Sequence, residues 1–316
     1  MAPQQAPIPA SVIFASLACA ATGAAVAQVQ TGHYIPGWNA GLQAGVMAPD
    51  PGFYMGSTTH FYHADDAKDG DGNKVPDAGQ TDSIITELAF VWRPDWKVLG
   101  ANYQAVLAPS VGNLSGRPIL VDGEFEDPPV GLSDTFIAPA ALGWHWQELD
   151  LLASFGIFAP TGKYNHGSND NTGMGFWSFM PYTVASYRTE RGIFAKTPLL
   201  LMGAFRYEWH SEQDGHNFTP GDNYTIEWGV GLEVTAKTSI GLNGFFYRQS
   251  DDASGSDATP TSKYRADGVG ASVAHSFGPI DANLRLYQDQ NVENGPDGTA
   301  VFLELGWGWP KQTAQP

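Results

Sequence analysis

Polar and charged side chains recur at every second position in segments that are otherwise apolar. In the segment 222–234, Ile226 and Trp228 alternate with Thr225 and Glu227. This period of two is typical of a β-strand whose two faces meet different surroundings. The polar positions that we predict to line the lumen of a barrel are Glu87, Asn102, Gln104, Arg206, Glu208, Glu227, Glu233, Asn243, Asp281, Asn283, Arg285 and Glu304.

Two interpretations of this polar set stay open. Charges inside a barrel must be hydrated or paired, so Arg206 and Arg285 are expected to pair with neighbouring acids. The surplus of acids would then make a wet pore selective for cations. Alternatively, the set is a polar network that only fills and stiffens a narrow barrel.

No motif in the chain predicts catalysis, a cofactor or a metal site. The eight histidines show no HxxxH or HExxH spacing, and no Gly-x-Ser-x-Gly elbow occurs. The run from Asp69 to Asn73 resembles the start of a calcium loop, but Lys74 and Gln80 occupy the positions of its glycine and its bidentate glutamate. We therefore expect a solvated acidic loop over 65–77.

The polar positions must be placed by strands of about ten residues each. Alternating segments bounded by Gly, Pro, Asn and Asp occur at 52–62, 82–92, 96–108, 133–146, 149–160, 177–188, 196–210, 222–234, 238–249, 266–276, 279–290 and 298–309. Short connections between these segments alternate with connections that are mostly long and polar. The pattern predicts an all-β fold, an antiparallel transmembrane β-barrel of about twelve strands over 52–309, with short periplasmic turns and long extracellular loops.

The amino terminus carries an export signal. Residues 1–27 are predicted to be a signal peptide, because residues 11–27 are apolar and small and end in Ala25-Val26-Ala27, a small-x-small cleavage site. Cleavage there would also remove Cys19, the single cysteine. Nowhere else is an uncharged apolar run long enough for a transmembrane helix, so a membrane would have to be crossed by strands.

Composition narrows the class of protein further. Charged residues make up 16% of the chain and the net charge is −17, which argues against nucleic acid as a partner. A secreted β-sandwich would also alternate in polarity. It would not need tryptophans such as Trp92, Trp144 and Trp307 at the strand ends, where membrane barrels place aromatic girdles.

Residues 28–51 precede the first strand and cannot be a regular strand throughout, because Gly and Pro interrupt them. Their aromatic and aliphatic side chains are numerous, so we expect part of this segment to fold into the barrel as a plug. A disordered periplasmic tail is the alternative. Residues 310–316 form a C-terminal tail.

Several motifs together suggest a family. Gly131-Leu132-Ser133-Asp134, Ala159-Pro160-Thr161-Gly162-Lys163-Tyr164, Tyr224-Thr225-Ile226-Glu227-Trp228-Gly229 and Gly244-Phe245-Phe246-Tyr247-Arg248-Gln249 resemble the outer-membrane family named for the meta-cleavage pathway of phenol degradation. The likeness extends over nearly the whole mature chain. Two features depart from the pattern: Ser133 replaces a usual glycine, and a tail follows the last strand.

The resemblance implies a passive channel for hydrophobic small molecules, aromatic ones included, in the outer membrane of a Gram-negative bacterium. Expected partners are outer-membrane lipid and lipopolysaccharide, the outer-membrane assembly machinery and a small hydrophobic solute. A general channel for small polar solutes or cations is the first alternative, and an outer-membrane hydrolase is the second. An apolar solute needs a greasy pocket, whereas a polar one needs a continuous wet path.

Overall fold

The computed structural model describes residues 32–76, 78, 80–112, 130–166, 168, 170–189, 197–258 and 263–310. The predicted signal peptide over 1–27, Cys19 and all but the first residue of the predicted tail over 310–316 lie outside these residues. The strands are β1 (Gly52–Lys68), β2 (Thr81–Arg93), β3 (Lys97–Val98), β4 (Ala101–Ala108), β5 (Ser110–Gly112), β6 (Gly131–Leu132), β7 (Thr135–Trp146), β8 (Leu149–Ala159), β9 (Ser178–Arg188), β10 (Leu199–His210), β11 (Asn223–Thr235), β12 (Thr238–Gln249), β13 (Arg265–Ser276), β14 (Ile280–Glu293) and β15 (Gly295–Pro310).

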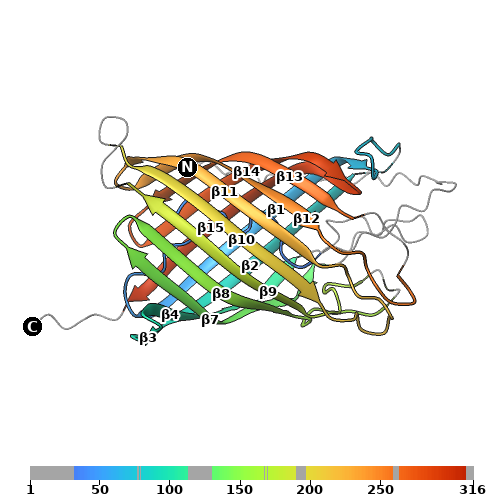
Figure 1. The fold of residues 1–316 in the computed structure, drawn as a ribbon, viewed down its shortest axis with the longest axis horizontal. Helices are drawn as coiled ribbons and strands as arrows, with labels where there is room; N and C mark the ends of the chain where they lie inside the picture. The colour runs from blue at the N-terminus through green and yellow to red at the C-terminus, as the bar shows by residue number, and fades with distance from the viewer. Residues whose placement is uncertain are drawn as a thin grey trace, which may run out of the picture.

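These strands form one closed antiparallel sheet (Figure 1). Strand β1 pairs with β15 on one side and with β2 on the other, which closes the barrel. Strand β2 pairs with both β4 and β5, which Pro109 separates within one wall strand. Strands β6 and β7 likewise share the next wall strand, so the wall has twelve strands. The predicted all-β barrel of about twelve strands is confirmed.

Strands β1, β14 and β15 extend at least three residues further at one end of the barrel than the sequence pattern predicts. Strand β1 continues past residue 62, because its pairing with β15 runs on through Ala64↔Gly298 to Lys68↔Gly295. The predicted strands at 279–290 and 298–309 leave a connection over 291–297, and this part of the prediction is wrong. Strands β14 and β15 meet at the single residue Asn294, which adopts a left-handed φ of 57°. Polar residues on both faces hide the strand pattern at this end.

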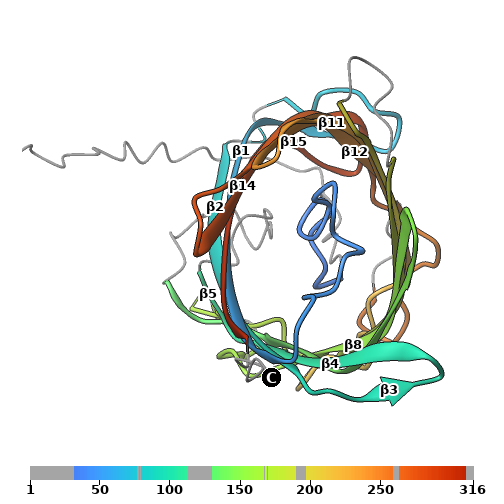
Figure 2. The same ribbon diagram turned by 90° about the vertical axis from the view of Figure 1, so that its left-hand side faces the viewer.

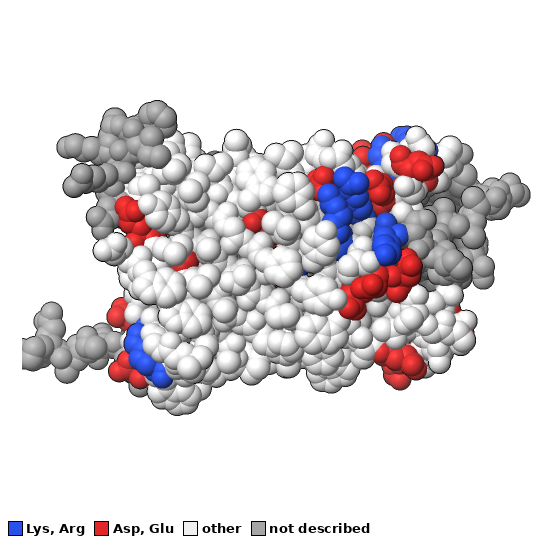
Figure 3. Space-filling view, viewed as in Figure 1, with Lys and Arg blue, Asp and Glu red and all other residues white. Residues whose placement is uncertain are grey.

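The two faces of the wall differ as the alternation predicts. In β11, Asn223, Thr225 and Glu227 point inward and are each 1% exposed. Ile226 and Val230 of the same strand point outward and are 40% and 38% exposed. Figure 3 shows the outer face as largely uncharged, with most Lys, Arg, Asp and Glu side chains toward the two ends. Among the described residues, no helix is long and apolar enough to cross a membrane.

The two ends of the barrel carry different connections. One end, here called the turn end, has the short links between β7 and β8, β11 and β12, and β13 and β14. The other, the loop end, has the longer links over 160–177, 211–222 and 250–264. Tryptophans cluster at the turn end, where the rings of Trp92 and Trp96 lie 5.0 Å apart and those of Trp144 and Trp146 lie 6.4 Å apart. Rings in this position are typical of a membrane interface.

Residues 32–50, here called the inner segment, run through the interior of the barrel. Figure 2 shows this segment inside the ring of strands. Two turns shape it, in which the Trp38 N–H donates to the Ile35 carbonyl and the Ala44 N–H donates to the Gly41 carbonyl. Because these turns break any extended run, the segment cannot add a strand to the sheet.

We predict that an arginine on the outer wall destabilises the barrel far more than one on the inner wall. Leu284 of β14 is 45% exposed on the outside. Leu284→Arg should cost about 2–4 kcal/mol of unfolding free energy if the residue lies near the membrane midplane. Urea unfolding in lipid vesicles measures this cost. The matched control is Ala274→Arg, which faces the lumen from β13. Equal losses in the two variants would contradict the assignment of the faces.

Candidate functional site

A buried ion pair fastens the inner segment to the wall. The Arg206 Nε donates to Glu227 Oε2 at 3.0 Å, and both side chains are almost completely buried. The Tyr34 hydroxyl donates to Glu227 Oε1 at 2.6 Å, and the Gly37 N–H donates to the same oxygen at 2.8 Å. The Arg206 guanidinium lies 4.6 Å from the centre of the Tyr34 ring. Each charge is therefore paired and hydrogen-bonded, as a buried charge must be.

A second carboxylate holds the start of the segment. Glu208 accepts the backbone N–H of His33 at 2.8 Å and that of Tyr34 at 3.3 Å. The Asn223 side chain also donates to Glu208, at 3.3 Å. Glu208 thus supplies acceptors to a turn that has no strand partner.

The other arginine of the lumen binds the middle of the segment. Arg285 donates to the Trp38 carbonyl at 2.6 Å and to Glu304 Oε2 at 2.6 Å. The Trp38 indole N–H donates to Glu87 Oε1 at 3.2 Å. Arg206 and Arg285 both pair with acids, as the sequence predicts.

Glycines in the wall make room for the end of the segment. A Cβ atom added to Gly229 would lie 2.9 Å from Leu42 Cδ2, and one added to Gly241 would lie 2.9 Å from Leu42 Cδ1. On β9, two strands away from β11, Ser186 Oγ accepts the Gly45 N–H at 3.0 Å. Leu42 therefore occupies a depression on β11 and β12 that only residues without side chains can form.

Asp134 joins the family-like motifs at the loop end. Its Oδ1 accepts the Gly162 N–H at 3.0 Å, and its Oδ2 accepts the Met174 N–H at 2.7 Å. His33 Nε2 lies 2.9 Å from the same Oδ2. The Asp134 carboxylate thus ties the loop over 160–177 to the inner segment, which gives the Gly-Leu-Ser-Asp and Pro-Thr-Gly motifs a structural role.

A serine and two histidines meet beside Asp134. Ser178 Oγ lies 2.6 Å from His33 Nδ1 and 2.7 Å from His210 Nδ1. The Asn223 amide lies 3.3 Å from His210 Nε2. One set of neutral tautomers satisfies the whole chain, with protons donated from Asn223 through His210, Ser178 and His33 to Asp134. Ser178 is fully buried between the two rings, so its hydroxyl has no room for an acyl substrate.

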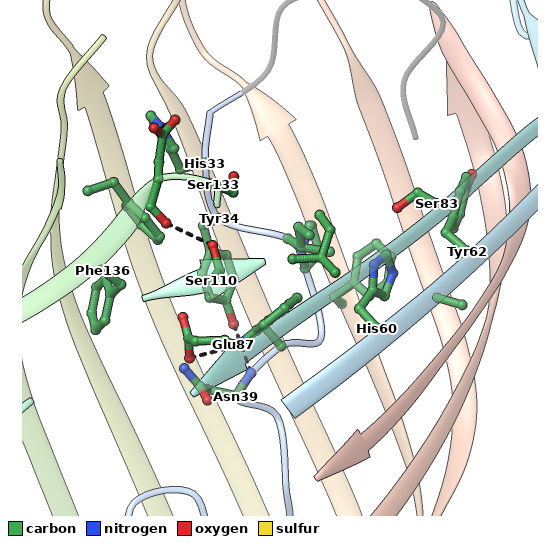
Figure 4. A pocket seen from close by; sticks show the side chains of 18 of the residues that line it. His33, Tyr34, Asn39, His60, Tyr62, Ser83, Glu87, Ser110, Ser133 and Phe136 are labelled. Atoms are coloured by element: carbon green, nitrogen blue, oxygen red, sulfur yellow. Dashed lines mark hydrogen bonds and ion pairs between the residues drawn. The ribbon is translucent and has the colours of Figure 1, made fainter. Parts of the chain in front are cut away.

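The inner segment and the loop end enclose a chamber (Figure 4). His33 and Ser133 lie at one end of it, and Glu87 and Asn39 lie at the other. Its walls are mainly rings and apolar chains: Ile35, Trp38, His60, Tyr62, Ile85, Phe136, Phe158, Met174, Met180, Tyr182, Phe245 and Tyr264. Such a lining suits an apolar or aromatic solute.

A second hollow, here called the vestibule, opens at the turn end on the other side of the inner segment. Glu87 and Tyr182 line both hollows, so the segment and these side chains divide the lumen in two. The chamber is mainly apolar, whereas the lining of the vestibule is mixed and includes charged side chains such as Arg206, Asp281 and Glu304.

The structure distributes the predicted lumen residues among three places. Glu87, Gln104, Arg206, Glu233, Asp281, Asn283 and Glu304 line the vestibule. Glu208, Glu227, Asn243 and Arg285 are almost completely buried inside the barrel. Asn102 lies elsewhere, since it binds Lys97 of the β3–β4 hairpin. The aromatic chamber was missed by the sequence reasoning. Its signal is the aromatic residues that fall on the inward phase of the strands, such as His60, Phe136 and Phe245.

In the calcium-like loop, the carboxylate oxygens of Asp69 accept hydrogen bonds from the loop itself. Asp69 Oδ1 accepts the Asn73 N–H at 2.8 Å and the Asp71 N–H at 3.0 Å, and these bonds lower the pKa of the Asp69 carboxyl. Lys74 pairs with Asp66. Within the described ranges, no group of three or more His, Cys, Asp or Glu side chains could hold a metal ion.

The closed wall and the polar lumen define a β-barrel of the outer-membrane type. The chain belongs to the family described as "Putative MetA-pathway of phenol degradation", whose sequence profile matches residues 64–305. No curated protein matches the chain in sequence.

Three solved structures resemble the chain to different degrees. An outer membrane channel from Pseudomonas putida F1 is 16% identical, with a TM-score of 0.69 over 88% of this chain and 100% of that chain. The translocator domain of the autotransporter NalP from Neisseria meningitidis is 12% identical, with a TM-score of 0.44 over 85% of this chain and 92% of that chain. The TodX monoaromatic hydrocarbon channel is 10% identical, with a TM-score of 0.39 over 83% of this chain and 91% of that chain. The first of these likenesses shows the fold, and the other two are weaker.

We predict that filling the glycine depression loosens the inner segment. In Gly229→Leu the new side chain would occupy the space of Leu42, so the segment should leave the wall more often. The readout is maleimide labelling of Ala44→Cys in a background with Cys19→Ser, and we expect labelling about tenfold faster. The control is Gly203→Leu, where an added Cβ meets nothing within 4 Å. Equal labelling rates in the two variants would show that Leu42 does not anchor the segment.

Proposed function

We propose that the protein is a passive channel of the Gram-negative outer membrane that admits hydrophobic small molecules, aromatic ones included. The observation that carries this proposal is the chamber, in which rings and apolar chains dominate the lining. A greasy pocket inside an otherwise polar lumen gives an apolar solute a place to leave water. The family of the chain agrees with this solute class.

The turn end would face the periplasm and the loop end the outside, as in other outer-membrane barrels. A solute would then enter the chamber from the loop end, beside Ser133, Asp134 and Met174. Lipopolysaccharide and lipid would surround the uncharged wall, and the outer-membrane assembly machinery would insert it. The channel would catalyse no reaction, and the hydrogen-bonded serine and histidines would serve as a structural anchor.

The inner segment would act as a plug against ions. It carries its own buried hydrogen bonds to Glu208, Glu227 and Arg285, so it fills the lumen without leaving charges unpaired. Without the inner segment, the lumen of this barrel would be wide and filled with water. This is the setting in which the alternative function, passage of small polar solutes or cations, would be realised.

Deleting residues 30–48 should convert the barrel into an open pore. Planar-bilayer recordings should show a large stable conductance in the deletion variant and little or none in the intact protein, because the segment no longer separates chamber from vestibule. Liposomes containing the variant should also swell with sugars. Retained heat-modifiable migration would show that the variant is folded. A folded variant whose conductance equals that of the intact protein would contradict the role of the inner segment as a plug.

The opened pore should prefer cations. Glu87, Glu233, Asp281 and Glu304 line the vestibule, and Glu208 and Glu227 lose their bonds to the deleted segment. These acids outnumber Arg206 and Arg285. Reversal potentials measured in a potassium chloride gradient report the preference. A reversal potential of the anion-selective sign would contradict it.

A further inference from the structure

Glu87 is a carboxyl group placed among aromatic rings. It lies on the inner face of β2, between Thr58 of β1 and Ser110 of β5 in the register of the wall. Its Oε1 accepts the Trp38 indole N–H at 3.2 Å. The described residues supply no further donor to this carboxyl group, although each carboxylate oxygen can accept more than one hydrogen bond.

The two other carboxyl groups of the chamber are already in use. Asp134 accepts two backbone N–H groups and contacts His33. Asp289 accepts the Tyr62 hydroxyl at 2.7 Å and the Gly298 N–H at 3.2 Å. Glu87 is thus the acid of the chamber with the most unused acceptor capacity.

The rings around Glu87 offer stacking and edge contacts to a flat solute. Trp38 meets His60 at 6.1 Å between ring centres, and Phe136 meets Phe158 at 4.9 Å. Figure 4 shows Glu87 facing the inner segment near Asn39, with Phe136 to one side. Rings at such distances leave faces and edges that a further ring can contact.

The charge of the lining is one-sided. Among the described residues, the chamber has three carboxyl groups and no lysine or arginine in its lining. An aromatic carboxylate would therefore enter without a partner for its charge, which is costly in an apolar site. A hydroxyl or amino group on the ring would instead donate to Glu87 and complete its hydrogen bonding.

We propose that the chamber selects aromatic solutes that carry a hydrogen-bond donor, and that Glu87 is the residue that sets this preference. The inference rests on the proposed function and names its solute class. Aromatic alcohols and amines are favoured, plain hydrocarbons bind more weakly, and aromatic carboxylates are rejected. Glu87 positions the donor end of the solute while the rings hold its apolar part.

Isothermal titration of the purified full-length protein in detergent tests this with four probes of similar size: toluene, benzyl alcohol, benzylamine and benzoate. Benzyl alcohol and benzylamine should bind about tenfold more tightly than toluene, since a buried acceptor left without its donor is penalised. Benzoate should bind most weakly.

Two substitutions separate hydrogen bonding from charge. Glu87→Leu removes the acceptor, so the preference for benzyl alcohol over toluene should vanish while toluene binding persists. Glu87→Gln keeps an acceptor oxygen but cannot carry a charge, so it should keep the preference for benzyl alcohol. The matched controls are Glu293→Leu and Glu293→Gln at the loop end of β14, outside the chamber lining, and both should keep the unaltered ranking of probes.

The possible results point to different failures. If toluene binds the unaltered protein as tightly as benzyl alcohol, the role of Glu87 is wrong while the proposed hydrophobic channel stands. If none of the four probes binds, the chamber is not a solute site and the proposed function itself fails. The comparison of probes on the unaltered protein decides the first point even if Glu87→Leu does not fold.

Discussion

The arrangement of the lumen depends on the buried pair of Arg206 and Glu227. Two charges removed from water are tolerated only when each finds its partner and its remaining hydrogen bonds, and here Tyr34 and Gly37 of the inner segment supply those bonds to Glu227. Removing the segment would leave this acid short of donors, so segment and wall stabilise each other. Breaking a pair of this kind typically costs about 3–5 kcal/mol.

This constraint explains how one barrel can be polar inside and still offer an apolar site. Charged side chains of the wall bind the inner segment through hydrogen bonds. The segment in turn contributes Ile35 and Trp38 to the lining of the chamber. Without the segment the same wall would enclose a wet, acid-lined tube. The solute site is therefore built from two parts, a ring-bearing wall and a segment that the wall binds through its charges.

The sequence predicts the wall well because the alternation of polarity is a local property of each strand. It predicts that Ile226 faces outward and Glu227 inward without any information on the neighbouring strands. It predicts less at the loop end, where β1 and β15 extend through polar residues whose pairing is visible only in the register of the sheet. The charged pairs of Arg206 and Arg285 follow from the cost of burying a charge. The chamber does not follow, because Trp38, Phe136 and Phe245 are far apart in the chain and a ring on the inward phase has no pattern that separates packing from binding.

The most direct test of the chamber as the solute site is a crystal structure of the protein soaked with 4-bromobenzyl alcohol, using the anomalous signal of bromine to locate the ring. We expect one strong bromine peak inside the chamber, with the hydroxyl of the probe within hydrogen-bond distance of Glu87. A bromine peak in the vestibule, or on the outer wall alone, would contradict the assignment of the aromatic chamber as the solute site.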